Sequence, residues 1–183
     1  MTKKFILLLL IIEIVSCKKQ TIPKPTGYLT LEYPQAKYVV FENSCPFTFD
    51  MNEAAIIKGK SNCNFEINYS KMKATLYMSY RPVANNLKVL LRDAQKLTYK
   101  HVIKADDIIA QPFVNKGSKV YGMFYSVNGN AATNAQFYVT DSTNHFLDCS
   151  VYFYAKPNFD SVYPAAEFVK NDMRKLMESL KWK

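Results

Sequence analysis

The side chains best suited to covalent or acid–base chemistry in this chain are four cysteines and two histidines. His145 and Cys149 lie four residues apart in a segment that alternates like a β-strand, so their side chains point to the same face. A strand advances about 3.3 Å per residue, which separates the two Cα atoms by roughly 13 Å. A nucleophile and its base must lie within hydrogen-bond distance, so the spacing predicts no Cys–His dyad.

The other polar candidates form no reactive pattern. His101 falls on the apolar side near the end of a predicted helix, where the helix dipole commonly stabilises a histidine. Asp106 and Asp107 are adjacent, so their carboxylates diverge, and no calcium-binding loop surrounds them. The sequence has no CxxC, HExxH or GxSxG motif and no glycine-rich phosphate loop. We therefore expect no catalytic residues, no metal site and no cofactor.

Cys17 follows a segment that has the features of a secretion signal. The apolar run of residues 5–15 has signal-peptide length and is too short to span a bilayer. Residues 14–17 (IVSC) resemble a bacterial lipobox, in which the cysteine receives a diacylglyceryl group. We expect a signal peptide over residues 1–16 and lipidation of Cys17. The alternative is a plain secretory signal, with Cys17 an ordinary thiol.

The remaining chain divides into a tether and one domain. Residues 17–27 combine prolines and polar residues without periodicity, which is typical of an extended linker. Residues 28–183 suffice for one well-packed core. They contain no stretch long and apolar enough to cross a membrane. We predict a single domain held near a membrane by a lipid-anchored tether.

Three cysteines remain in the predicted domain, and export exposes them to oxidising conditions. Cys45 and Cys63 each begin an alternating apolar segment, so they could face each other across a hairpin. Cys149 lies at the centre of a predicted strand among large apolar residues, where a cysteine acts as a small hydrophobe. We predict a Cys45–Cys63 disulfide with Cys149 free. Three reduced cysteines are the alternative.

An antiparallel meander over residues 117–157 is predicted to form the centre of the fold. We expect its strands at residues 119–127, 136–141 and 145–154, separated by turn-forming residues. The first of them carries large apolar residues at both parities. This pattern predicts a strand in the middle of its sheet, covered on both faces.

Helices and further strands complete the prediction. Residues 87–101 and 162–180 have apolar residues at helical spacing. Pro112 favours an edge position for one strand. The further strands are expected at residues 28–33, 45–50, 62–69, 71–80 and 108–114. We predict an α+β fold, an antiparallel sheet covered by a middle helix and a C-terminal helix. This order is similar to that of PsbP/Mog1-like α/β/α sandwiches.

The chain carries 24 Lys and Arg against 15 Asp and Glu, a formal net charge of +9. A basic excess can favour nucleic acid or an anionic membrane surface. An exported, lipid-anchored protein does not meet nucleic acid, and the lysines are scattered along the sequence. We expect no nucleic-acid partner and a solvated basic surface, with weak attraction to anionic headgroups as the functional alternative.

Five segments of the chain carry a resemblance to a known family. They are residues 28–34 (YLTLEYP), 93–101 (DAQKLTYKH), 136–142 (QFYVTDS), 152–158 (YFYAKPN) and 176–183 (LMESLKWK). Together they resemble the GldD-type gliding-motility lipoproteins of Bacteroidetes. The resemblance implies a lipid-anchored accessory protein of the cell envelope, needed for gliding and linked to type IX secretion. Its partners would be proteins of that apparatus, and it supplies no catalytic residues.

Two functions of different classes follow from these observations. The first is a non-enzymatic lipoprotein that supports assembly or stability of the gliding and type IX secretion machinery. The second is a periplasmic module that holds a small ligand or peptide between sheet and helix, as the many tyrosines, including Tyr152 and Tyr154, indicate. Lys18 replaces the aspartate associated with inner-membrane retention in enteric bacteria. We therefore favour the periplasmic leaflet of the outer membrane.

Overall fold

The computed structural model describes residues 33, 35–154 and 159–183. Its strands form a seven-stranded antiparallel sheet in the order β3-β4-β5-β9-β8-β7-β6 and a three-stranded sheet in the order β1-β2-β10. The elements are β1 (Tyr38–Phe41), β2 (Phe47–Asn52), β3 (Ile56–Ser61), β4 (Asn64–Tyr69), η2 (Ser70–Met72), β5 (Ala74–Pro82), α2 (Leu87–Tyr99), η3 (Lys100–Ile103), β6 (Ala105–Asn115), β7 (Val120–Gly129), β8 (Ala135–Thr140), β9 (His145–Phe153), α3 (Phe159–Ser179) and β10 (Lys181–Trp182). This is the predicted α+β fold.

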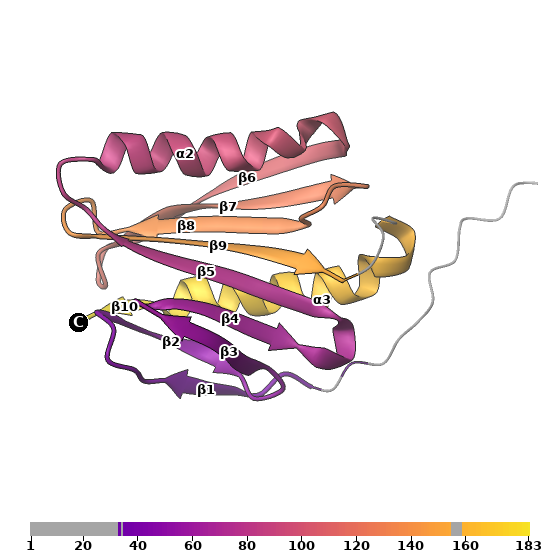
Figure 1. The fold of residues 1–183 in the computed structure, drawn as a ribbon, viewed down its shortest axis with the longest axis horizontal. Coiled ribbons are helices and arrows are strands. Elements are labelled where there is room, and N and C mark those ends of the chain that lie inside the picture. The colour runs from indigo at the N-terminus through magenta and orange to yellow at the C-terminus, as the bar shows by residue number, and fades with distance from the viewer. Residues whose placement is uncertain (1–32, 34, 155–158) are drawn as a thin grey trace, which may run out of the picture.

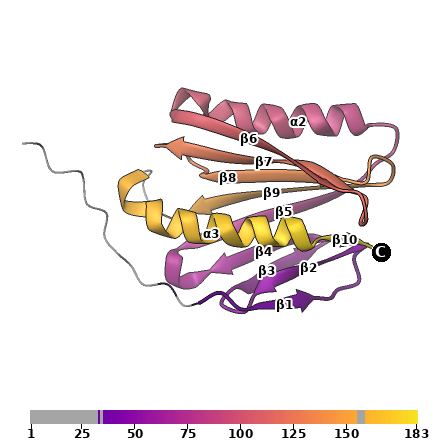
Figure 2. The same ribbon diagram turned by 180° about the vertical axis from the view of Figure 1, so that it is seen from behind.

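The large sheet lies between the two long helices (Figures 1 and 2). On one face, α3 and β2 close the main core, in which Val169 and Met173 pack against Phe124 and other strand residues. On the other face, α2 covers the end of the sheet formed by β6 to β9. Both faces of the meander are therefore buried, which confirms the predicted cover.

The strand β7 shows why that cover is needed. Val120 and Phe124 face the α3 side, whereas Tyr125 faces α2, and all three are buried. The prediction that this strand lies in the middle of the sheet is wrong, because β7 is next to the edge strand β6 and β9 is central. Helices on both faces can bury a strand near the edge as fully as a central one.

Several predicted elements form with different partners or limits. The predicted strand at residues 45–50 forms as β2, but in the small sheet. The segment at residues 71–80 begins with the turn of η2 and becomes β5. The helix at residues 87–101 ends as η3. The strand at residues 108–114 forms within β6 at the sheet edge, as Pro112 indicates. The strand expected at residues 28–33 lies almost wholly outside the described residues.

A buried carboxylate fastens the N-terminal strands to α3. Asp172 accepts hydrogen bonds from the Tyr38 hydroxyl at 2.6 Å and from Asn52 Nδ2 at 2.7 Å. Burial raises the pKa of Tyr38, and the hydrogen bond to Asp172 and the charge of that carboxylate raise it further. Because hydrogen bonds satisfy the carboxylate, its burial beneath β1 and β2 is tolerated.

Gly122 gives a test of the β7–β8 pairing. A Cβ at this position would lie 2.0 Å from the carbonyl oxygen of Tyr138 and 2.9 Å from Val139 Cγ1. The clash is with backbone, so relief requires movement of the ladder. We predict that Gly122→Ala lowers the free energy of unfolding by about 1–3 kcal/mol in urea denaturation.

Gly117→Ala is the matched control. Its Cβ would meet only the Asn115 side-chain oxygen, at 3.5 Å, so stability should change little. Equal stability of the two variants and the parent would contradict the register of β7 and β8.

Candidate functional site

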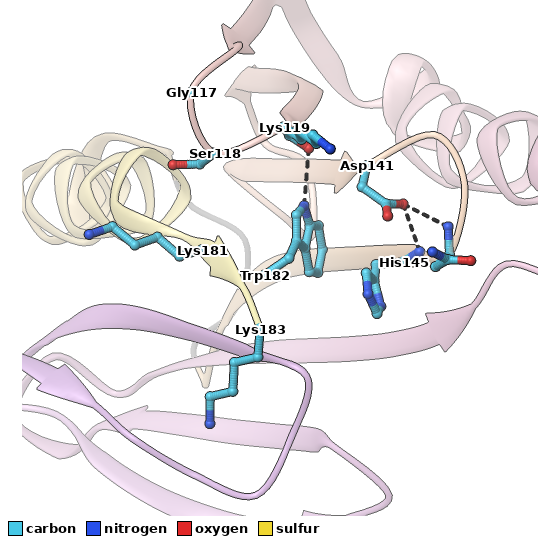
Figure 3. Close-up of a pocket in the computed structure, with 9 residues that line it drawn as sticks. Gly117, Ser118, Lys119, Asp141, His145, Lys181, Trp182 and Lys183 are labelled. Carbon is cyan, nitrogen blue, oxygen red and sulfur yellow. Dashed lines mark hydrogen bonds between the residues drawn. The ribbon is translucent and has the colours of Figure 1, made fainter.

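A hollow of about 450 Å³ opens where the C-terminal strand meets one end of the meander (Figure 3). Three segments far apart in the sequence form its wall: the turn before β7, the turn between β8 and β9, and β10 with the residue after it. The lining residues are Gly117, Ser118, Lys119, Asp141, Asn144, His145, Lys181, Trp182 and Lys183.

Trp182 lies in the middle of this hollow (Figure 3). Its indole N–H donates a hydrogen bond to the carbonyl oxygen of Lys119 at 3.2 Å. Its ring stacks on His145, with centroids 5.0 Å apart and planes inclined by 16°. The Tyr80 hydroxyl lies 2.9 Å from Nδ1 of the same imidazole. His145 is therefore held between two aromatic side chains, with one ring nitrogen already hydrogen-bonded.

The carboxylate of Asp141 is used by its own turn. Its Oδ1 accepts hydrogen bonds from the backbone N–H groups of Thr143, Asn144 and His145, at 3.0, 2.8 and 2.8 Å. Partial burial by itself would raise the pKa of Asp141, but these hydrogen bonds and one from the Thr143 hydroxyl lower it to about 2. The group is ionised and already saturated at neutral pH, which makes it a poor general base.

The hollow can attract an anionic or polar group but positions no nucleophile. Lys119, Lys181 and Lys183 line the hollow beside Trp182, but the side chains of Lys181 and Lys183 extend away from its ring (Figure 3). Lys183 Nζ already donates to the carbonyl oxygen of Asn43, so the mixture suits weak binding rather than chemistry. The hollow also lies at one end of the sheet and is not formed between the sheet and a helix. It therefore differs in location from the pocket that the binding-module hypothesis requires.

The tyrosines on which that hypothesis depends lie elsewhere. Tyr77 and Tyr154 are exposed, with their hydroxyl oxygens 3.0 Å apart, and Tyr152 packs edge-on against Tyr77 with centroids 5.7 Å apart. All three come from strands β5 and β9 or the residue after β9. They form an aromatic group on the open part of the sheet, and they line no pocket beneath α2.

The predicted Cys45–Cys63 disulfide is present, with a Cα–Cα distance of 5.6 Å. The hairpin geometry expected for it is wrong. Cys45 precedes β2 of the small sheet, and Cys63 lies in the turn between β3 and β4 of the large sheet. The bond therefore joins the two sheets, a link that the alternation of each segment does not reveal.

Cys149 is free and fully buried in β9, as predicted. Burial raises the pKa of its thiol well above the usual value, and the charge of Asp148 adds to the rise. The thiol therefore stays neutral at physiological pH, and a neutral, inaccessible thiol is a poor nucleophile. Cys149 packs on the α3 face of the sheet, in the main core.

The other candidate residues are separate from these groups. Cys17 and the side chain of His101 lie outside what the structure describes. Asp106 and Asp107 are exposed in β6. Across the described residues, no three His, Cys, Asp or Glu side chains gather closely enough to hold a metal ion. No helix in the same part of the chain has the length and apolar character needed to cross a membrane.

Comparison with known protein families identifies the family to which this chain belongs. The family model described as gliding motility lipoprotein GldD matches residues 18–182. The chain belongs to the GldD family. No curated protein matches it. This is a family of gliding-motility lipoproteins. The chain is therefore a membrane-anchored protein of the cell envelope that is associated with gliding motility.

The matched residues 18–182 include both cysteines of the disulfide and every lining residue of the hollow except Lys183. The hollow was missed in the sequence because its walls come from three distant segments, and β10 is only two residues long. The available signal was Trp182, the single tryptophan of the chain, placed between two lysines. A tryptophan between two lysines indicates a residue near the surface, but the sequence does not show which segments pack against it.

The disulfide gives a prediction about stability. Residues 45 and 63 are separated by 18 positions, and closing a loop of that size stabilises a domain by about 3 kcal/mol. This is a large share of the roughly 5–15 kcal/mol of a whole domain. We predict that Cys45→Ser/Cys63→Ser loses about that amount in urea denaturation.

A reducing agent provides the control for this prediction. Reduction should lower the stability of the parent protein to that of the double variant and leave the variant unchanged. A parent protein insensitive to reduction, or a disulfide-linked peptide that contains Cys149, would contradict the assignment.

Proposed function

We propose that this GldD family member is a non-enzymatic accessory lipoprotein that supports assembly or stability of the gliding and type IX secretion machinery. The family match over residues 18–182 carries the proposal, because it includes every described residue except Lys183. The state of the reactive side chains supports it. The Asp141 carboxylate is saturated, His145 is stacked against Trp182, and the Cys149 thiol is buried.

The proposed organisation has three parts. Residues 1–16 are a signal peptide, residues 17–27 a tether lipidated at Cys17, and residues 28–183 the domain. The lipobox-like residues 14–17 and the family's character as lipoproteins support this division. We place the anchor in the periplasmic leaflet of the outer membrane, because Lys18 is not the aspartate of inner-membrane retention. The partners are proteins of the gliding and secretion apparatus.

A binding module is the second candidate, and one observation favours it. The hollow around Trp182 offers about 450 Å³, and three lysines are among the residues that line it. A periplasmic ligand with an anionic group would fit that chemistry. The hollow can equally receive a side chain of a partner protein, so it does not require a small-molecule function.

The test is Cys17→Ser, expressed in a strain that lacks the native chain. Without lipid the protein should move to the soluble periplasmic fraction, because the acyl chains that hold it are absent. Cells should fail to glide, and mass spectrometry should show lower amounts of the gliding and secretion proteins.

Cys149→Ala is the matched control, because it removes a buried thiol and leaves residues 14–17 unchanged. This variant should remain membrane-bound and restore gliding. Membrane retention of the Cys17→Ser protein would contradict the anchor. Loss of gliding with normal amounts of the machinery would contradict the assembly role.

A further inference from the structure

The outer side of α2 and the residue after it carry a row of four cations at four-residue intervals, which we name the cationic stripe. They are Lys88, Arg92, Lys96 and Lys100. Residues four apart are neighbours on a helix surface, so these side chains follow one line. All four are exposed, whereas Leu90, Ala94 and Thr98 on the opposite side of the helix are buried. Basic residues scattered along the sequence are thus gathered here on one surface.

Few acidic side chains of the protein neutralise the positive charge of the stripe. Like charges four residues apart repel each other and weaken a helix. Asp93 is the only acidic residue of α2, and its carboxylate lies 3.6 Å from Nε of Arg92. Among the residues that the structure describes, the other three cations form no ion pair. A row of cations that lowers helix stability and lacks internal partners favours an external anionic partner.

Large apolar side chains are exposed beside the stripe. Val89 is 44% exposed, Tyr99 52% and Ile103 90%. The Tyr99 ring also packs edge-on against the buried Tyr125, with centroids 6.2 Å apart, so only its outer part is available for contact. Val89 and Tyr99 belong to α2, and Ile103 ends η3, which continues it. A cluster of four Lys and Arg on a helix is typical of surfaces that bind anionic lipid headgroups. The apolar face of α2 is used by the sheet, so exposed Val89, Tyr99 and Ile103 can add only limited apolar contact. Figure 1 shows α2 as the outermost layer of the molecule, where a flat surface can reach it.

A lipid anchor at Cys17 allows this contact. Strand β1, the first strand of the described chain, lies on the side of the molecule opposite α2 (Figure 1). The residues from 18 to 32 can span about 50 Å when extended. A domain of this size is roughly 40 Å across. The tether is therefore long enough for the domain to tip until α2 touches the leaflet.

We propose that the cationic stripe, with Val89, Tyr99 and Ile103, is a second membrane contact that binds anionic phospholipid headgroups. It orients the domain on the leaflet and leaves the hollow around Trp182 free. The inference rests on the proposed anchor only for bringing the domain to the membrane. The experiment below removes the anchor, so the two proposals fail separately.

The experiment uses the secreted Cys17→Ser chain, which carries no lipid. Its cosedimentation is measured with vesicles of phosphatidylglycerol and phosphatidylcholine, and with vesicles of phosphatidylcholine alone. The parent should bind only the anionic vesicles, and about 0.5 M salt should weaken the binding. Each cation near an anionic surface contributes about a fivefold gain in partitioning. Arg92→Gln/Lys96→Gln/Lys100→Gln should therefore bind about 100-fold more weakly.

The matched control is Lys58→Gln/Lys71→Gln/Lys116→Gln, which removes the same charge from exposed residues away from α2. It should bind within about twofold of the parent. Circular dichroism checks that both triple variants fold.

Three outcomes would overturn the proposal. Equal losses in the stripe variant and the control would show a general attraction of a basic protein. Absence of binding by the parent would exclude the contact. Binding of the parent to poly-glutamate but not to vesicles would assign the stripe to an acidic protein surface instead.

Discussion

The two-sided apolar character of β7, β8 and β9 is the constraint on which the rest of the structure depends. These strands turn buried aromatic side chains to both faces of the sheet, with Phe124 on the α3 side and Tyr125 on the α2 side. Water is excluded from both faces only if a layer covers each one. The position of α2 follows from this requirement, and so does the outward direction of its cationic stripe.

The α3 side of the same sheet explains how the N-terminal part of the domain is held. Asp172 hydrogen-bonds to Tyr38 of β1 and Asn52 of β2, and the Cys45–Cys63 bond joins the small sheet to the large one. The Asp172 hydrogen bonds lie at the start of β1, next to the proposed tether, whereas the disulfide lies at the other end of β2. A pull on the tether is therefore resisted first by this buried hydrogen-bond network and the short ladder of β1 and β2, and the covalent bond holds the far end of β2.

Periodicity predicted the meander and both long helices, because residues 119–154 and the α2 and α3 segments repeat their apolar pattern over enough residues. It could not predict which sheet receives β2, since alternation shows which side chains share a face and not which strand lies alongside. The oxidising compartment and the alternation of each segment selected Cys45 and Cys63 as the disulfide pair. The predicted hairpin between them was wrong, because β3 lies between the two segments along the chain and β2 belongs to the other sheet. The hollow around Trp182 depends on three distant segments, and such contacts leave no local signal.

The central claim is that this GldD family member acts as a folded, anchored protein rather than through a reactive site. The most direct test replaces the side chains that could do chemistry, with His145→Gln and Cys149→Ala in one chromosomal copy. Gliding speed is measured in cells whose amount of membrane-bound protein matches the parent. The account predicts gliding at the parental speed. Loss of gliding with a normal amount of the folded, anchored protein would contradict it.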